Sequence, residues 1–454
     1  MHGVKEYQMS ESRDIADIWE KVVVLLEDQR VYILLMAILS ALVLIGTALS
    51  NMWGDLDHYY DNAGDVLSGL MPYSEAKFEY PPLSLVFMLI PRVLTWDLES
   101  FHYGCAILTY VFLAIGSYFL VRIADERIGC RWQTHLIMIL VVLFGNYFVI
   151  ARNDVYPTVM VIIAFWLYLK DRHVLAFIMM ALAAMTKMYP AIFLIPMLMP
   201  FVLKGEWKNG VMCLLAAATV CFIVELPFLI TDPSTAFAYL NYHSDRGIQV
   251  ESVAASFFMI YDLIVPGNLS VVFAYGSDNL SGAGPDALAP FMNTILAVVL
   301  ISFVAVMLVR IHRLRVSETT GPQVVLISVT MLMLFIAFSK VYSAQYLIWI
   351  LMLLPLTQML CFSRTDRMAV LLVTIPFGLF SVFSYIGYNA IGLPELDSVA
   401  VFFTSMKNIL HILLTIILLH MCWNETKTVV RDGGVDYVLQ TSSGADPLTK
   451  EKYE

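Results

Sequence analysis

The chain has 454 residues, of which 59% are apolar and only 14% are charged, and its mean hydropathy is +0.76. Soluble domains are about 45–50% apolar and about 25% charged. This apolar surplus exceeds what one soluble core can bury, so lipid must solvate much of the surface. The net charge of −10 gives no support for nucleic-acid binding. We therefore expect an all-α, polytopic membrane protein without a nucleic-acid partner.

The first 30 residues are largely polar and lack the pattern of a signal peptide, so they predict a cytoplasmic N-terminal segment, 1–30. A membrane domain follows over 31–422. The polar tail, 423–454, is predicted to be a disordered cytoplasmic segment because it offers little apolar surface to pack. The six cysteines are scattered without a CxxC pair and are interpreted as small buried hydrophobes.

Apolar runs between polar breaks predict twelve membrane-spanning helices. Their ranges are 31–50, 101–121, 136–150, 155–169, 174–186, 188–203, 210–230, 288–310, 322–339, 345–361, 368–390 and 402–422. One further run, 81–95, is ambiguous between another span and a helix lying at the interface. A crossing there would break the alternation of loop charge described below, so we expect 81–95 to lie at the surface of a long first outer loop, 51–100.

The distribution of cations orients these spans. With both termini inside, only seven of the 27 lysines and arginines fall outside. These are Lys77, Arg92, Arg152, Lys187, Arg246, Lys340 and Lys407. A cation that is kept at a membrane boundary on the disfavoured side is a candidate functional residue. The alternative is that each one extends its ammonium or guanidinium group to the lipid headgroups.

The first outer loop places two acids, Asp55 and Asp57, directly after the first span. A partly desolvated carboxylate there can act as a general base. The Asp-x-Asp spacing is also typical of metal-binding motifs in soluble nucleotide-sugar enzymes. A simpler interpretation is a solvated loop that caps a helix over 61–70. Tyr59 and Tyr80 are either interfacial anchors or platforms for a sugar ring or a lipid phosphate.

Further polar clusters lie at the outer ends of later spans. The turn formed by Arg152, Asn153 and Asp154 predicts a self-contained ion pair. The last part of the second long outer loop, 231–287, is interpreted as an ordinary linker. Together the remaining clusters supply the candidate substrate-binding residues Lys187, His243, Arg246, Gln249, Glu251, Lys340 and Gln345. Cations that converge at a membrane surface suit an anionic phosphate. A nearby acid suits deprotonation of a hydroxyl.

Four stretches, in chain order, carry a family resemblance. The first is the outer loop 51–100, with the patterns Asp55-Leu56-x-x-Tyr59-Tyr60 and Tyr80-Pro81-Pro82-Leu83. The other three are Lys187-Met188-Tyr189-Pro190, residues 246–252 and residues 343–349. In the last stretch Ala344 stands where the family has a proline. These stretches resemble the GT-C superfamily and, more narrowly, the polyprenyl-phosphate-dependent mannosyltransferases of glycosyltransferase family 87. The resemblance covers about residues 30–420.

The resemblance implies a GT-C-like membrane fold with interfacial helices in the first outer loop. It also implies a first-loop carboxylate as catalytic base, at Asp55 by position and at Asp57 as the second choice. The implied donor is a polyprenyl-phosphate sugar, with mannose as the sugar. The acceptor is expected to be a lipid or a glycan, and the membrane a prokaryotic cell membrane with the active site facing outward.

On this basis the working hypothesis is an inverting transfer in which Asp55 deprotonates the acceptor. Lys340 and Arg246 would neutralise the leaving phosphate, assisted by Lys187 or His243. Gln345, Glu251 and Tyr80 would orient hydroxyl groups. Surrounding cations make a metal unnecessary, so no cofactor is expected, although the Asp-x-Asp pair keeps a divalent metal open.

The alternative function is a transporter or flippase for an anionic or lipid-linked substrate, which twelve spans would also suit. Two features of the sequence count against transport: the halves show no internal repeat, and the polar clusters lie on one face and not at the midplane. A non-catalytic scaffold would not explain the cations on the disfavoured face.

Overall fold

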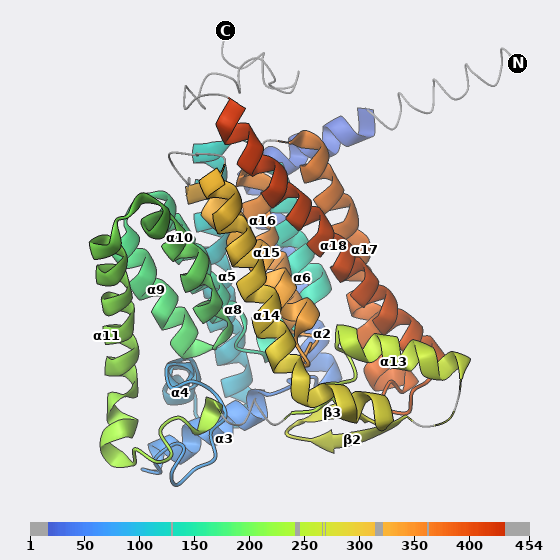
Figure 1. Ribbon diagram of the computed structural model, residues 1–454. Coiled ribbons are helices and arrows are strands. Elements are labelled where there is room, and N and C mark those ends of the chain that lie inside the picture. The colour runs from blue at the N-terminus through green and yellow to red at the C-terminus, as the bar shows by residue number, and fades with distance from the viewer. Residues whose placement is uncertain are drawn as a thin grey trace, which may run out of the picture.

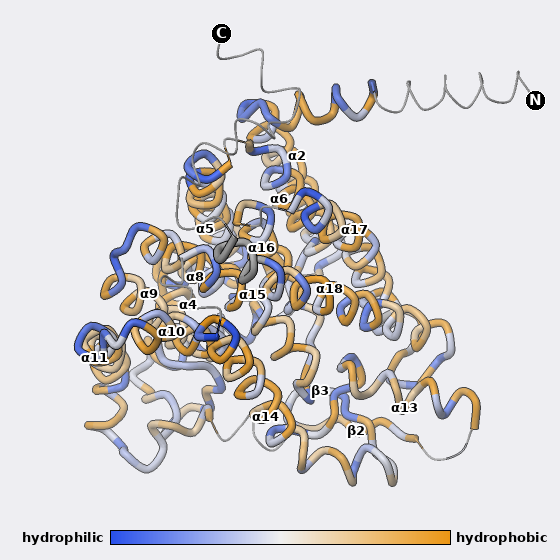
Figure 2. Tube along the Cα trace, turned by 45° about the horizontal axis from the view of Figure 1, so that its top comes forward, coloured by the Kyte–Doolittle hydropathy of each residue, from blue (hydrophilic) through white to orange (hydrophobic). Residues whose placement is uncertain are grey.

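The computed structural model describes residues 17–128, 130–240, 246–265, 267, 269–313, 321–360 and 363–431. Within these residues, seven helices are long and apolar enough to cross a membrane. They are α2 (Gln29–Ser50), α5 (Leu98–Arg127), α11 (Trp207–Thr231), α14 (Ala283–Arg313), α15 (Gly321–Phe338), α17 (Arg364–Ile386) and α18 (Ser398–Arg431). Figure 2 shows apolar residues along most of these helices and hydrophilic ones mainly at the connections.

Five shorter apolar helices complete the bundle. They are α6 (Trp132–Gly145), α8 (Val155–Leu169), α9 (His173–Thr186), α10 (Leu194–Lys204), which continues the 3-10 turn η1 (Tyr189–Phe193), and α16 (Tyr346–Leu360). Residues 347–360 of α16 are all buried by neighbouring helices. A helix enclosed by protein does not have to match the full lipid thickness. Each predicted span corresponds to one of these twelve helices, so the all-α polytopic fold is confirmed.

The molecule has two chemically different ends (Figure 1). α2 begins and α18 ends at one of them. The other, which we call the loop end, carries α3 (Leu56–Leu67), α4 (Ser84–Leu94), α13 (Val253–Ile264) and the strands. The short segments α7 (Phe148–Ala151) and η2 (Gly387–Ile391) follow the loop-end termini of α6 and α17.

Helix α4 occupies the run that was ambiguous in the sequence. Its 11 residues span roughly 16 Å, about half the thickness of a hydrocarbon core. The guanidinium of Arg92 lies 4.1 Å from the ring centroid of Tyr60 in α3, so the two short helices pack together. The position of 81–95 at the membrane surface stays a prediction.

Two local expectations are wrong. The first-loop helix begins at Leu56 and not at residue 61, and Asp55, at its N-cap position, makes no side-chain capping bond. The expected linker in the second long loop instead contains a three-stranded antiparallel sheet in the order β1 (Ile248–Gln249), β3 (Ser277–Ser281), β2 (Ser270–Ala274). Leu280 pairs with Ile248 and is buried with it, which gives this segment a small core that its glycines and polar residues concealed.

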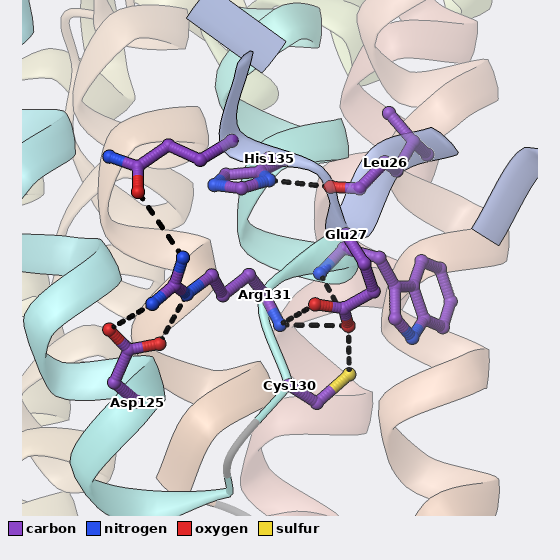
Figure 3. A network of polar contacts seen from close by, with 8 residues as sticks. Leu26, Glu27, Asp125, Cys130, Arg131 and His135 are labelled. Carbon is purple, nitrogen blue, oxygen red and sulfur yellow. Dashed lines mark hydrogen bonds and ion pairs between the residues drawn. The ribbon is translucent and has the colours of Figure 1, made fainter. Parts of the chain in front are cut away.

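The end opposite the loop end is held by a polar network (Figure 3). The carboxylate of Glu27 accepts hydrogen bonds from the Cys130 thiol at 2.9 Å and from the backbone N–H of Arg131 at 3.0 Å. The guanidinium of Arg131 pairs with Asp125 of α5. These contacts tie the segment before α2 to the connection between α5 and α6. At the same end α18 continues to Arg431, and residues 432–454 of the predicted tail lie outside the described residues.

Candidate active site

The centre of the site is a buried carboxylate that joins three connections of the bundle. Asp154 precedes α8 and has no exposed surface. Its Oδ1 accepts hydrogen bonds from Nζ of Lys187 at 2.7 Å and from Nε1 of Trp349 at 2.6 Å. Burial lowers the pKa of Lys187, and the contact with Asp154 opposes that shift by favouring the ammonium. Asp154 is therefore the main source of charge compensation for the lysine, and the charge of Glu79 adds to it.

Aromatic rings surround this ion pair. Trp349 stacks on Tyr189 with ring centroids 4.0 Å apart and on Tyr346 with centroids 3.8 Å apart. The positive charge of Arg246 acts on the hydroxyl of Tyr346, so the second long loop reaches the same region. The Lys-x-Tyr-Pro and Gln-Tyr-x-x-Trp stretches are thus brought together by stacking.

The first outer loop is joined to this centre by a second ion pair. Asp55 contacts Arg152 through Oδ2 and Nη1. Their side chains are 30% and 22% exposed, so the pair is partly shielded from solvent. The interpretation of 152–154 as a self-contained ion pair is wrong, because Asp154 is taken up by Lys187 inside the bundle while Arg152 extends to the first loop.

Asp57 lies in a more open position than Asp55. Its side chain is 64% exposed, and its Oδ1 lies 2.7 Å from Nε2 of His102, whose ring stacks on Trp53. Asp57 lines a cleft of about 210 Å³ at the loop end. The other residues that line this cleft are Asn51, Met52, Trp53, Gly54, Tyr147 and Tyr385. The cleft is therefore lined by residues that flank Asp55 in the chain, by Tyr385 of α17 and by Tyr147 of the connection after α6.

Tyr59 and Tyr80 connect the first loop to the turn before α8. Their ring centroids are 5.7 Å apart, and the hydroxyl of Tyr59 accepts a hydrogen bond from the backbone N–H of Asn153. Burial raises the pKa of Tyr59 and of Tyr80 well above its ordinary value. Both phenols are therefore neutral hydrogen-bonding groups that dock the first loop on the turn before α8.

The second long loop contacts the connection between α15 and α16 along its backbone. The N–H of Gln249 donates to the carbonyl of Lys340 at 2.9 Å, and its side-chain Oε1 accepts from the N–H of Tyr342 at 2.9 Å. Lys340 is 7% exposed. Gln249 therefore sets the position of the chain segment that carries Lys340.

Glu251, two residues after Gln249, is buried among charged groups of both signs. Its carbonyl accepts hydrogen bonds from Nζ of Lys407 at 3.3 Å and from Nδ2 of Asn408 at 3.1 Å. The Lys407 ammonium also lies 4.1 Å from the ring centroid of Tyr342. Burial raises the pKa of the Glu251 carboxyl, and the charges of Lys407 and Arg152 oppose the shift. α18 thereby anchors the loop that contains Arg246.

The structure brings together most of the residues chosen from the sequence, which come from four separate connections. Gln345 is half-buried just before α16, and His243 lies outside the described residues. The candidates missed by sequence reasoning are Arg152, Asp154, Tyr147, Tyr385 and Lys407. Arg152 and Lys407 carried a signal, because both were among the seven cations on the disfavoured side.

In the part of the chain that the structure describes, no group of three or more histidine, cysteine, aspartate or glutamate side chains is arranged to hold a metal ion. Asp55 and Asp57 instead face Arg152 and His102. The expectation of a reaction without a cofactor stays a prediction.

Comparison with known proteins shows which family the chain resembles. The sequence profile of glycosyltransferase family 87 matches residues 78–339, which include Tyr80, Lys187 and Arg246. Asp55 and Asp57 precede the matched stretch, and Lys340 follows it directly. The chain is also similar to GPI mannosyltransferase 1 of Dictyostelium discoideum, with 27% identity over 333 residues that cover 66% of this chain and 70% of that protein.

The profile match extends over more than half of the chain, and the bundle supplies the membrane-embedded scaffold. The transporter and scaffold alternatives do not account for that match. The chain belongs to glycosyltransferase family 87 and is a multi-pass membrane glycosyltransferase.

Proposed function

We propose that this chain transfers a mannosyl group from a polyprenyl-phosphate donor to a hydroxyl of a lipid or glycan acceptor. The observation that carries the proposal is the convergence of cations from separate connections beside an acid, at one end of a lipid-embedded bundle. A polyprenyl chain would lie in the bilayer and place its phosphate at that end. The choice of mannose draws on the name of the relative in Dictyostelium.

The proposed reaction is a single displacement that inverts the anomeric carbon. Asp55 accepts the proton of the acceptor hydroxyl, whose oxygen forms a bond to the anomeric carbon. The bond between that carbon and the phosphate oxygen breaks, and the polyprenyl phosphate leaves with the electron pair. Lys340 and Arg246 offset its charge. General-base assistance contributes about 10²–10⁴-fold, and oriented cations add to it by stabilising charge in a shielded site.

The cleft suggests where the sugar ring lies. Tyr147 and Tyr385 form one wall, with ring centroids 5.2 Å apart, and Asp57 lies in the same cleft. Aromatic faces bind sugar rings, and Tyr80 and Gln345 would orient hydroxyl groups. The hydrogen bonds of Gln249 to the segment that carries Lys340, and of the Glu251 carbonyl to Lys407, favour a role in positioning the cation-bearing segments.

The loop end is proposed to face the outside of a prokaryotic cell membrane. The excess of lysine and arginine at the opposite end supports the sidedness, while the choice of a prokaryotic membrane draws on the family resemblance alone. A membrane-impermeant thiol reagent tests the sidedness in intact cells. It should label Ser74→Cys at the loop end and leave Lys208→Cys unlabelled, and the reverse pattern would invert the topology.

Transfer by the purified full-length chain in lipid nanodiscs tests the function. A short-chain polyprenyl-phosphate mannose and GDP-mannose are offered in parallel with a membrane lipid extract as acceptor. The expected result is a mannosylated product from the lipid donor alone, with the opposite anomeric configuration to the donor. Transfer from GDP-mannose, or retention of configuration, would contradict the proposal.

A further inference from the structure

The proposed base is held by an arginine. Oδ2 of Asp55 contacts Nη1 of Arg152 across the boundary between the first loop and the turn before α8. A carboxylate whose oxygens accept from a guanidinium is less able to take a proton from a hydroxyl, because the ion pair stabilises the charged form. If Asp55 is the base, as the proposed function requires, Arg152 must release it during the reaction.

Arg152 has two further acidic neighbours. Its guanidinium experiences the charges of Asp154 and Glu251. Oδ1 of Asp154 already accepts from Lys187 and Trp349, while its buried Oδ2 has no hydrogen-bond partner among the described residues. Nε of Arg152 is buried and has no hydrogen-bond partner among the described residues. A guanidinium has five N–H donors in a planar fork. Arg152 therefore retains donor capacity for a further anion.

The cleft of about 210 Å³ lies close to the pair, although neither Asp55 nor Arg152 lines it. Gly54 and Asp57, on either side of the paired aspartate, line the cleft, and so does Tyr385, which interacts electrostatically with Arg152. The planar guanidinium binds phosphate oxygens in a two-point geometry that a lysine cannot reproduce.

We propose that the phosphate of the donor replaces Asp55 as the partner of Arg152, so that donor binding frees the catalytic carboxylate. Arg152 then contacts the substrate, and the acceptor is deprotonated only when the donor is in place. The inference rests on the proposed function and adds an order to it, because the donor must bind before the acceptor can react.

The exchange makes a counterintuitive prediction about binding. Asp55 and the phosphate compete for one guanidinium, so removing the aspartate charge should strengthen phosphate binding even though turnover is lost. The probe is farnesyl phosphate, titrated against the full-length chain in nanodiscs without acceptor. Asp55→Asn should bind it about 1.5- to fivefold more tightly than the wild type, the range that a partly exposed ion pair allows.

Asp57→Asn is the matched control. It removes the same charge two residues away, but that carboxylate faces His102 and not Arg152. It should change affinity by less than Asp55→Asn does. The gain should also disappear in the double variant Asp55→Asn with Arg152→Gln. Arg152→Lys, which keeps the charge but loses the fork, should recover only part of the affinity lost in Arg152→Gln.

Equal effects of Asp55→Asn and Asp57→Asn, or a gain that persists without Arg152, would overturn the exchange. If Arg152→Gln does not fold, the comparison of the two aspartate variants still decides the question. If farnesyl phosphate does not bind even the wild type, the polyprenyl-phosphate donor is wrong. If it binds but Asp55→Asn brings no gain, only the exchange is wrong.

Discussion

The ammonium of Lys187 lies 2.7 Å from the carboxylate of Asp154, which has no exposed surface, and this pair joins the ends of α8 and α9 at the loop end. The sequence assigned each residue to a separate cluster. Their contact makes the two clusters one unit, and Trp349 of α16 shares the same carboxylate oxygen.

Removing that carboxylate should destabilise the bundle strongly. Asp154→Ala leaves the Lys187 ammonium without its partner in a buried position, which typically costs about 3–5 kcal/mol. The measurement is thermal unfolding of the purified protein in one detergent. Asp125→Ala is the control, because its partner Arg131 is one-third exposed at the opposite end and such pairs contribute about 0–1 kcal/mol. Equal melting temperatures for the two variants would contradict the structural role of Asp154.

Lys340→Ala should weaken donor use more than it affects folding. If the ammonium contacts the donor phosphate, its loss should lower kcat/KM for the donor about 10- to 100-fold, the range for a hydrogen bond to a charged group. Lys77→Ala, an exposed cation of the first loop, should stay near the wild type. Similar losses in both variants would indicate a general effect of surface charge.

Substitutions of Gln249 and Gln345 should distinguish a residue that stabilises the fold from one that contacts the substrate. Gln249→Ala removes the acceptor for the N–H of Tyr342, and an unpaired buried donor costs about 1–3 kcal/mol, so thermal stability should fall. Gln345→Ala, at a half-buried position, should leave stability within about 0.5 kcal/mol yet reduce transfer. The assignment fails if Gln345→Ala melts early while Gln249→Ala does not.

The buried carboxyl of Glu251 should make stability depend on pH. Burial raises its pKa above the ordinary value of 4.5, so the folded chain binds this proton more tightly than the unfolded chain does. Its contribution to folding is complete below about pH 4.5 and is lost as pH rises through the raised pKa. Glu251→Gln removes this dependence, so the variant should gain stability relative to the wild type as pH increases from 4.5. Melting curves that stay parallel across pH would contradict this.

The membrane helices and the grouping at one end were predictable because apolar length and loop charge are direct consequences of lipid as solvent. Lys187, Arg246 and Lys340 were chosen because topology disfavours them, and the structure places them at one end with Asp55. Span length and loop charge can both be read from a single sequence, which is why these features could be predicted.

The pairing of charges was not predictable in the same way. Arg152 and Asp154 lie two residues apart, so an ion pair between them was the simplest expectation. Asp154 is instead buried in the bundle, where it pairs with Lys187. Tyr385 and Lys407 lie within apolar spans, and their roles depend on which loop packs against each helix. The small sheet was missed because its strands are short and its central strand, β3, is mostly polar, and the pairing of Leu280 with Ile248 reveals a core.

The role of Asp55 is tested most directly by the turnover number of Asp55→Asn in the nanodisc assay with saturating polyprenyl-phosphate mannose, measured beside Asp57→Asn. We expect a fall of about 10²–10⁴-fold for Asp55→Asn and a much smaller change for Asp57→Asn, with both variants melting near the wild type. A folded Asp55→Asn variant that turns over at close to the wild-type rate would contradict the assignment of Asp55 as the catalytic base.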